Sequence, residues 1–433
     1  MGRPSAQRWR PQPPKRAPRE PAPAPLDLYT LRVSPDAPAR VAPALPPWPY
    51  YAPDEVAAVV EVLESGRVNQ WTGDDVARFE AAYAEALEVP HCIALANGTL
   101  ALEAALAAFD IGPGADVLVP ARSFAASATC VLARGGRPRF VDLADDSQLV
   151  SVETLEAART PETRAAIIVH LGGAMPDMIA ICAWAESKGI VLIEDCAQAH
   201  GASWAGRPAG AWGDAAAFSF CQDKIITTGG EGGLLTTHDD AAFRRAWSVK
   251  DHGKSYARVF EATHPPGFRW LIESAGSNWR MTGMQAAIGL RQLAKLPEWN
   301  AKRTAHAATL ERTLASVEGL RFESRPEALH HAWYRAYAYL DGEAMPWVLR
   351  DRILELLAAG GWPAQSGVCP EIYRERVFAE AGFAPTQPFA RAAALGSSSL
   401  AFSVHPNCSD AQIEAYGQAI VAACGRAREE LKR

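Results

Sequence analysis

The sequence predicts an α/β fold, in which helices cover both faces of a mostly parallel sheet and a smaller C-terminal α+β domain follows. Between residues 90 and 195, short apolar runs alternate with segments of helical periodicity. The predicted strands are apolar along their whole length, which is typical of parallel strands buried on both faces. Beyond about residue 292 the alternation gives way to a long helical pattern and then to mixed strands and helices.

The N-terminal part of the chain divides into a tail and two helices. Residues 1–45 are rich in proline, alanine and arginine, so we expect a disordered tail. A first helix is predicted from Asp54 to a C-cap at Gly66, and a second begins after Asp74. The expected apolar face of the first helix is Val56, Val59, Val60 and Leu63. The expected apolar face of the second is Val76, Phe79, Tyr83 and Leu87.

The remaining elements follow from the same patterns. Strands are predicted at residues 92–95, 117–120, 139–142, 166–170, 190–195, 215–220 and 233–237, and the helices between them at 100–109, 124–133 and 178–188. In the C-terminal part we expect helices at 350–361 and 409–431 and a strand within 400–406. A chain of 433 residues is long enough for two domains. We therefore predict a tail at 1–45, a large domain at 46–290 and a small domain at 291–433.

The composition excludes several classes of protein. The chain has 48% hydrophobic and 21% charged residues and a net charge of -6, so it has no general attraction to nucleic acid or anionic membranes. No apolar run approaches the roughly 18 residues of a membrane helix. The eight cysteines are scattered without a CxxC pair, which predicts thiols in a reducing cytoplasm. His170, His200 and His252 lack the spacing of a zinc site, so we expect no metal.

Lys224 is the first candidate for catalysis. It lies between the predicted strands at 215–220 and 233–237, just before a glycine cluster at 229–233. A lysine held beside the core loses part of its hydration, which favours the neutral amine that acts as a nucleophile. The glycines lack the GxxxxGK[ST] pattern of a phosphate loop, so we interpret them as a tight turn.

Three further groups follow the ends of predicted parallel strands, where ligands bind in open α/β sheets. The turn 97–99 precedes a helix, whose N-terminus suits a phosphate. Asp195 ends an apolar strand and would need a cationic or N–H partner there. Ser219 precedes Lys224 by five residues. A lysine, a buried carboxylate and a phosphate cradle at one sheet edge are what pyridoxal 5'-phosphate (PLP) requires.

The chain also resembles a known family over residues 46–433. The motifs ALANGTLALEAAL, VLIEDCAQAHGA, FSFCQDKIITTGGEGG and GSNWRMTGMQAAIGLRQL occur in this order. They are similar to those of the DegT/StrS family of PLP-dependent sugar aminotransferases, which have the fold of type I PLP enzymes. The lysine at 224 argues against the dehydratase branch of the family, in which histidine replaces it.

The resemblance implies roles for individual residues. Lys224 would form the Schiff base with the cofactor, Asp195 would hold the pyridinium nitrogen, and Gln198 would bind the ring oxygen. Ser219 and the turn at Gly98 and Thr99 would hold the phosphate.

Three further roles are implied in the same way. Phe124 would stack on the cofactor ring. Asn278 and Arg280 would reach the phosphate from a neighbouring subunit, which implies a homodimer with shared active sites.

We therefore expect an aminotransferase that uses PLP, with pyridoxamine 5'-phosphate as its intermediate form. By resemblance, it would move an amino group from L-glutamate or L-glutamine to the keto group of a nucleotide-linked sugar, giving an amino sugar for a polysaccharide or secondary metabolite. A keto-cyclitol of the scyllo-inosose type is the alternative acceptor. The polar segment 251–254 has two open interpretations, a nucleotide diphosphate grip or a solvated insert.

Two other classes of protein are alternatives to an aminotransferase. A non-catalytic PLP-binding regulator would have the same fold, because fold alone does not determine function. A nicotinamide-dependent dehydrogenase is not favoured, since no GxGxxG follows the first strand.

Overall fold

A computed structural model describes residues 44–145 and 147–433, and these belong to one compact unit. The predicted disordered tail at 1–45 therefore lies outside the described residues, except for Ala44 and Leu45. No helix in the described ranges is long and apolar enough to cross a membrane.

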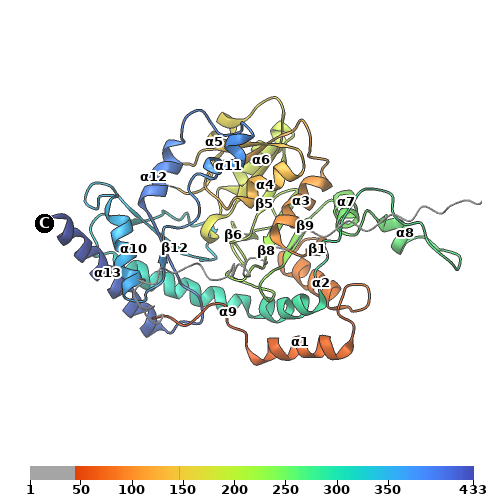
Figure 1. Ribbon diagram of the computed structural model, residues 1–433, viewed down its shortest axis with the longest axis horizontal. Coiled ribbons are helices and arrows are strands. Elements are labelled where there is room, and N and C mark those ends of the chain that lie inside the picture. Colours follow the sequence, from red (N-terminus) through yellow and green to blue (C-terminus); the bar gives the residue numbers. More distant parts are fainter. Residues whose placement is uncertain (1–43, 146) are drawn as a thin grey trace, which may run out of the picture. The chain divides into compact units, whose positions relative to one another are not determined.

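A seven-stranded sheet forms the centre of the described chain (Figure 1). In spatial order its strands are β1 (His91–Leu95), β9 (Gly233–Thr237), β8 (Ala215–Ser219), β5 (Val191–Asp195), β4 (Thr163–Val169), β2 (Asp116–Pro120) and β3 (Arg137–Val141). All pairs are parallel except those of β9, which runs antiparallel to both neighbours. The predicted mostly parallel sheet is confirmed, with Lys224 on the connection between β8 and β9.

Helices pack on both faces of this sheet because alternate strand residues point to opposite sides. Ile93, Ile167 and Ile193 belong to one hydrophobic cluster, while the adjacent Ala94 and Ile168 belong to another. Helices α3 (Gly98–Ala108), α4 (Ala126–Ala133) and α7 (Asp240–Lys250) contribute to the first cluster. Helices α2 (Asp75–Leu87), α5 (Val152–Ala158) and α6 (Met178–Lys188) contribute to the second.

The first helix, α1 (Pro53–Ser65), corrects one prediction. It ends at Gly66 with φ 67°, as expected, but the predicted apolar face is wrong. Val56, Val60 and Leu63 are 55%, 44% and 56% exposed. The residues turned inward are Glu55, Ala58 and Val62. Glu55 pairs with Lys295 of α9 at 3.3 Å, and Ala58 and Val62 form a hydrophobic cluster with Ala287 of the same helix. These contacts with α9 leave the predicted stripe on the outer side.

The second helix matches its prediction better. Its apolar residues Val76, Phe79, Tyr83 and Leu87 are all buried.

Helix α9 (Gly283–Leu314) links the central sheet to the C-terminal part of the chain. It begins before residue 292, because Thr282 and Gln285 form a capping box. A four-stranded antiparallel sheet follows, made of β10 (Leu320–Phe322), β12 (Ala336–Leu340), β14 (Ser399–Phe402) and β13 (Ala364–Gln365). The boundary predicted at residue 290 falls inside α9, and the division into two domains stays a prediction.

Helices α10 (Leu349–Ala359) and α13 (Asp410–Leu431) share the core of this second sheet (Figure 1). The predicted final helix and the strand within 400–406 are thus confirmed. The other elements of the described chain are β6 (Ser203–Trp204), β7 (Arg207–Pro208), β11 (Leu329–His330), α8 (Tyr256–Phe260), α11 (Arg376–Glu380), α12 (Ala390–Ser398) and two 3-10 turns, Leu171–Gly173 and Ile372–Arg374.

Candidate active site

A cavity of about 690 Å³ lies where the carboxyl ends of β1, β5 and β8 meet residues of the C-terminal sheet. The predicted site residues that line it are Gly98, Thr99, Phe124, Asp195, Gln198, Ser219 and Lys224. The structure thus gathers seven of the nine residues that the sequence implied, and the volume is in the range of small-molecule sites.

Lys224 lies on the loop after β8 and is half-buried. Its backbone N–H donates to the carbonyl of Cys221 at 3.1 Å, and its Nζ lies 5.1 Å from the ring centre of Tyr334. The amine is therefore held beside an aromatic face at the wall of the cavity.

Asp195 is the last residue of β5 and is 7% exposed. Its Oδ2 accepts a hydrogen bond from Ser127 at 2.7 Å, and its Oδ1 accepts one from the backbone N–H of Ala197 at 3.2 Å. Ser123 in turn lies 2.8 Å from Ser127. These donors are neutral, so they orient the carboxylate without supplying a positive charge, and a cation in the cavity can still pair with it. A protonated pyridine nitrogen is such a cation.

The side of the cavity where the sequence predicts the phosphate is built by strand register. Gly233 of β9 is paired with Leu95 of β1 on one side and with Ser219 of β8 on the other. A Cβ on Gly98 would lie 2.7 Å from that of Ser219, and a Cβ on Gly233 would lie 2.2 Å from the carbonyl oxygen of Asn97. Glycine is thus required at both positions, because the turn at 97–98 lies so close to Ser219 and Gly233 that a side chain would not fit.

The Asn97 side chain caps α3 by accepting from Leu100 at 2.9 Å. The backbone N–H groups of Gly98 and Thr99, in the first turn, have no partner within the helix and can bind a phosphate.

Gln198 and Phe124 lie on the cavity wall in different environments. The Gln198 side chain is buried, and its Oε1 accepts from the backbone N–H of Gly172 at 2.8 Å, so its amino group is the part available to an acceptor such as the ring oxygen. Phe124 is 67% exposed. Their roles toward the cofactor stay predictions, and so do those of the other site residues.

Asn278 and Arg280 do not line this cavity. Asn278 is exposed, and Arg280 pairs through Nη1 with Asp251 at 3.0 Å. Asp251 is fully buried and also accepts from Lys254 at 2.8 Å and from Gln70 at 3.3 Å. The segment 251–254 is therefore not simply solvated, because its carboxylate is buried and orients Arg280. A role in gripping a diphosphate stays a prediction.

Three residues at the cavity were not anticipated: Asp223, Tyr334 and Arg335. The Tyr334 hydroxyl donates to Asp223. Arg335 stacks on the Tyr334 ring at 4.8 Å and lies 3.9 Å from Asp223. Burial raises the pKa of Asp223, but the charge of Lys224, the Tyr334 hydrogen bond and the charge of Arg335 outweigh it and lower this pKa. Among the described residues lining the cavity, Lys224 and Arg335 are the only cations.

The sequence held one signal for these residues. The segment 331–340 is rich in aromatic residues and carries an arginine within an apolar run. It comes about 110 residues after Lys224, so its position could not be inferred from spacing.

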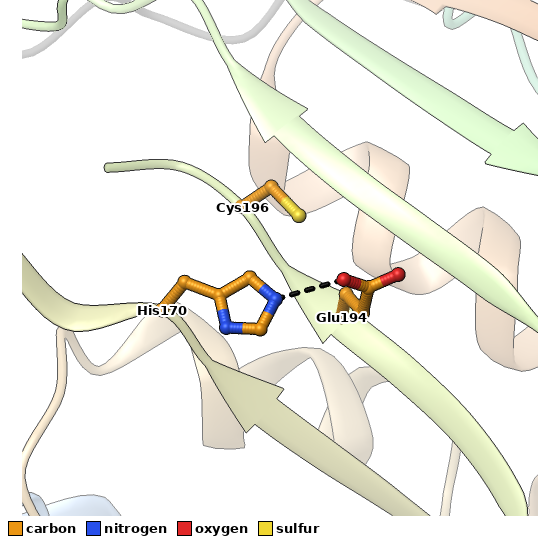
Figure 2. A group of neighbouring side chains, drawn as sticks. All are labelled: His170, Glu194 and Cys196. Atoms are coloured by element: carbon orange, nitrogen blue, oxygen red, sulfur yellow. Dashed lines mark hydrogen bonds and ion pairs between the residues drawn. The ribbon is translucent and has the colours of Figure 1, made fainter. Parts of the chain in front are cut away.

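A second polar cluster lies beside Asp195 but faces away from the cavity. His170, Glu194 and Cys196 are buried, and their nearest ligand atoms lie within 4.8 Å of one another (Figure 2). Burial raises the pKa of Glu194, yet hydrogen bonds and the charge of His170 lower it overall. Burial raises the pKa of the Cys196 thiol, which opposes the thiolate that metals bind.

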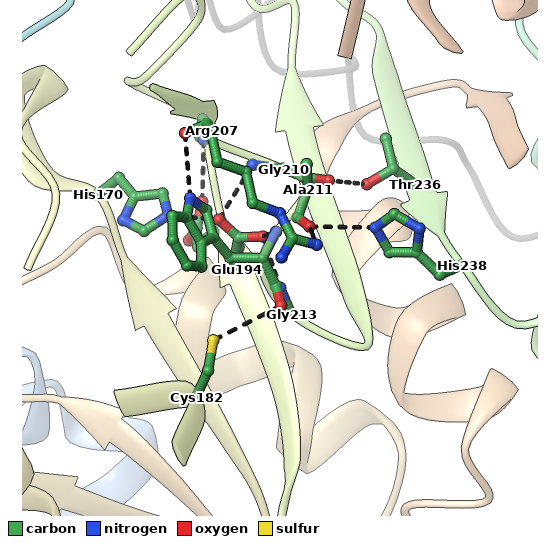
Figure 3. A network of polar contacts seen from close by, with 12 residues as sticks. His170, Cys182, Glu194, Arg207, Gly210, Ala211, Gly213, Thr236 and His238 are labelled. Carbon is green, nitrogen blue, oxygen red and sulfur yellow. Dashed lines mark hydrogen bonds and ion pairs between the residues drawn. The ribbon is translucent and has the colours of Figure 1, made fainter. Parts of the chain in front are cut away.

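The Glu194 carboxylate is already saturated with hydrogen bonds. It accepts from His170 Nε2 at 2.8 Å and from the backbone N–H groups of Gly210, Trp212 and Gly213 at 2.8 to 3.0 Å. Figure 3 shows how these contacts tie the loop 207–213 to β5. The cluster thus has a structural explanation, and a reaction without a metal stays a prediction.

The geometry agrees with the comparison to known proteins. Residues 49–421 match the DegT/DnrJ/EryC1/StrS aminotransferase family. The chain belongs to this family. The resemblance seen in the sequence is confirmed, and the protein is a PLP-dependent aminotransferase with the type I fold.

The chain aligns with individual relatives over most of their length. An L-glutamine:2-deoxy-scyllo-inosose aminotransferase of Streptomyces fradiae is 38% identical over 75% of this chain and 78% of its own. A GDP-perosamine synthase of Caulobacter vibrioides is 37% identical over 70% and 78%. The structure of an aminotransferase from Psychrobacter cryohalolentis is 43% identical, covers 89% of this chain and 100% of its own, and has a TM-score of 0.86.

Proposed function

We propose that this aminotransferase moves an amino group from L-glutamine or L-glutamate to the keto group of a polyhydroxylated ring. The observation that carries the proposal is the cavity that brings Lys224, Asp195 and the 98–99 turn together. PLP, when bound, supplies the electron sink that lets a proton leave the α-carbon of the amino donor.

The residues of the chain divide the remaining work. Lys224 holds the cofactor and, once released, carries the proton from the donor α-carbon as a general base. Asp195 holds the proton of the pyridine nitrogen, while Ser127 and the backbone of Ala197 fix the orientation of its carboxylate. Ser219 and the first turn of α3 hold the phosphate.

Arg335 suits the carboxylate of the amino donor. Its guanidinium is held only loosely by Asp223, at 3.9 Å, so most of its N–H groups remain for a second anion. An arginine can bind a carboxylate through two parallel hydrogen bonds.

For the acceptor, we now favour a keto-cyclitol over the nucleotide-linked sugar that the sequence put first. A nucleotide diphosphate would need cationic partners, whereas Lys224 and Arg335 are the only cations that one chain provides among the described lining residues. Both are already assigned, to the cofactor and the donor. The partner's Arg280, which we propose completes the site, would serve the cofactor phosphate. The similarity to relatives named 2-deoxy-scyllo-inosose aminotransferases supports the same choice. The similarity to GDP-perosamine synthase keeps the nucleotide-linked sugar as the second candidate.

We also propose a homodimer in which Asn278 and Arg280 complete the site of the partner subunit. Three observations support it. Asp251 holds Arg280 outside the cavity of its own chain. Phe268 and Trp270, on the loop before these residues, are each 80% exposed. The apolar stripe of α1 is exposed as well. Exposed apolar surface of this kind marks interaction sites.

The compartment that we propose is the cytoplasm. All eight cysteines are free thiols, which supports the proposal that the enzyme works in the cytoplasm.

The acceptor can be tested directly. The pyridoxamine form of the enzyme would be mixed with a keto-cyclitol, a set of nucleotide-linked keto sugars or buffer, and the return of the cofactor's visible absorbance would be followed. We expect the fastest return with the keto-cyclitol, and ¹⁵N from labelled glutamine in its product. A faster return of the visible absorbance with a nucleotide-linked sugar would make that sugar the preferred acceptor instead. If no amino donor ever yielded the pyridoxamine form, the regulator would become the better interpretation.

A further inference from the structure

The indole of Trp48 contacts the loop that carries Lys224. Its Nε1–H donates to the backbone carbonyl oxygen of Lys224 across 3.0 Å, although 176 residues separate the two in sequence. This bond and the turn from Lys224 N–H to the carbonyl of Cys221 satisfy both backbone polar groups of the lysine.

The indole is itself fixed by aromatic neighbours. It stacks on His405 with ring centres 5.8 Å apart and planes inclined by 21°, and it meets Trp299 edge to face at 5.3 Å. The guanidinium of Arg303, which is 1% exposed, lies 5.1 Å from the ring centre. Aromatic and cation–π contacts of this kind hold a ring in one orientation.

The chain next to Trp48 is anchored independently. Leu45 is buried in the hydrophobic core of the C-terminal sheet, and the carbonyl of Pro47 accepts from the side chain of Asn407 at 3.1 Å. The segment 45–48 therefore presents the indole N–H to the Lys224 loop from a fixed base.

Two other distant elements also support the loop among the described residues. The Tyr334 hydroxyl donates to the side chain of Asp223. Gln292 of α9 is fully buried and accepts from the backbone N–H of Thr227 at 2.9 Å. That bond lies three residues beyond Lys224, so the Trp48 bond is the one that acts on the lysine peptide itself. Without this hydrogen bond the peptide carbonyl of Lys224 can rotate. The direction of the Lys224 side chain then changes with the backbone.

We infer that Trp48 is a positioning residue for Lys224, setting the direction from which the amine meets the cofactor and the donor α-carbon. The inference rests on the proposed role of Lys224 in transamination. It assigns to Trp48 no contact with substrate or cofactor.

The test compares Trp48→Phe with Trp299→Phe. The first keeps an aromatic ring and removes the N–H that binds Lys224, whereas the second removes an indole from the same cluster without touching the Lys224 loop. Three readouts are compared in the full chain: amide hydrogen exchange of residues 221–228, the rate at which cofactor-free enzyme regains its visible band with PLP, and kcat and KM for glutamine.

For Trp48→Phe we expect faster exchange in residues 221–228, and band formation and kcat slower by about three- to tenfold, the typical effect of one lost hydrogen bond. KM for glutamine should not change, and Trp299→Phe should resemble the wild type. The inference is overturned if Trp48→Phe shows wild-type exchange and rates. It is also overturned if both variants show the same faster exchange and the same fall in kcat, because the loss of aromatic packing alone would then explain the effect.

If Trp48→Phe does not fold, Asn407→Ala replaces it, since this change loosens the anchor at Pro47 and leaves the indole in place. Faster exchange of residues 221–228 is then expected, and unchanged exchange overturns the inference. The exchange measurement does not depend on the reaction. Loosened exchange in an enzyme that never transaminates would refute the proposed function alone.

Discussion

Ser127 donates its hydroxyl hydrogen to the Asp195 carboxylate across 2.7 Å, at the floor of the cavity that Lys224 enters. The hydroxyl is neutral, so it orients the carboxylate without cancelling its charge. A charge kept in a site from which water is largely excluded acts strongly on a nearby cation.

Asp195→Asn should therefore slow the reaction with the amino donor by about 10²- to 10³-fold, because it replaces this charge by a neutral amide. The measurement is the single-turnover loss of visible absorbance after glutamine is added. Asp177→Asn is the matched control, since Asp177 caps α6 and asparagine caps equally well. Wild-type turnover in Asp195→Asn would refute the role given to this carboxylate.

Lys224→Ala should give a protein without the visible band of the bound cofactor and without transamination, because no other lysine lines the cavity among the described residues. Absorbance spectra and product assays are read together. Lys302→Ala, which removes a half-exposed lysine paired with Glu298, should behave as the wild type. A colourless Lys224→Ala enzyme that still transaminates at the normal rate would contradict the assignment.

Arg335→Gln should raise KM for the amino donor by about 10- to 100-fold, the range expected when a charged hydrogen-bond partner is lost. KM for the ring ketone should change much less, because the acceptor carries no carboxylate. Steady-state kinetics with each substrate varied in turn separates the two. Arg325→Gln, outside this cavity and paired with Glu311, serves as the control, and equal effects on both substrates would argue against donor recognition.

Two inactive variants should restore one another if the active sites are shared. In a dimer of Lys224→Ala with Arg280→Ala, one site would combine an intact Lys224 with an intact Arg280 from the other subunit. Random mixing should return about a quarter of the wild-type activity, as expected for a symmetric dimer. Each variant refolded alone is the control. Mixtures as inactive as the separate variants would place Arg280 outside the partner's site.

Stability should fall as the pH drops below 6.5, partly because of His200. Burial lowers its pKa to about 3, its Nε2–H donates to the carbonyl of Ser219 at 2.9 Å, and its Nδ1 accepts from Tyr83 at 2.7 Å. The folded state thus keeps the neutral ring, while the unfolded chain takes up a proton below its ordinary pKa. Between pH 6.5 and 5 this linkage should cost about 1.5 kcal/mol.

Urea unfolding at the two pH values measures this effect. His200→Gln should show a smaller loss between them than the wild type, and His330→Gln, which changes an exposed histidine, should not. An identical pH dependence in all three proteins would show that His200 does not couple to folding.

The site residues at the edge of the central sheet were predictable from the sequence, because the ends of the apolar strands can be located in it. Asp195, Ser219 and the 98–99 turn each follow an apolar run, and parallel strands bring such positions together. Tyr334 and Arg335 could not be placed in this way, since they lie on the loop just before β12, a strand of a different sheet. The contact of Trp48 with the Lys224 loop spans 176 residues, so no local pattern in the sequence indicates it.

The exposed stripe of α1 shows a second limit of sequence patterns. Helical spacing indicates that Val56, Val60 and Leu63 share a face of the helix. It does not indicate whether that face points to the core or to solvent. The inward face is the one that contacts α9, where Glu55 pairs with Lys295 and Val62 packs against Ala287. Partners more than 220 residues away leave no signal in a local pattern.

The crowding at Gly98 and Gly233 sets a boundary for engineering new substrate ranges. Even a methyl group at either position would collide with the neighbouring turn or strand. If this turn holds the phosphate as proposed, libraries built on the sheet edge should mostly yield enzymes that retain their cofactor poorly. On the opposite wall, Gln365 and Val368 also line the cavity, and neither this crowding nor a proposed role applies to their side chains. Specificity in this scaffold can therefore be redesigned from the C-terminal side while the cofactor side is left untouched.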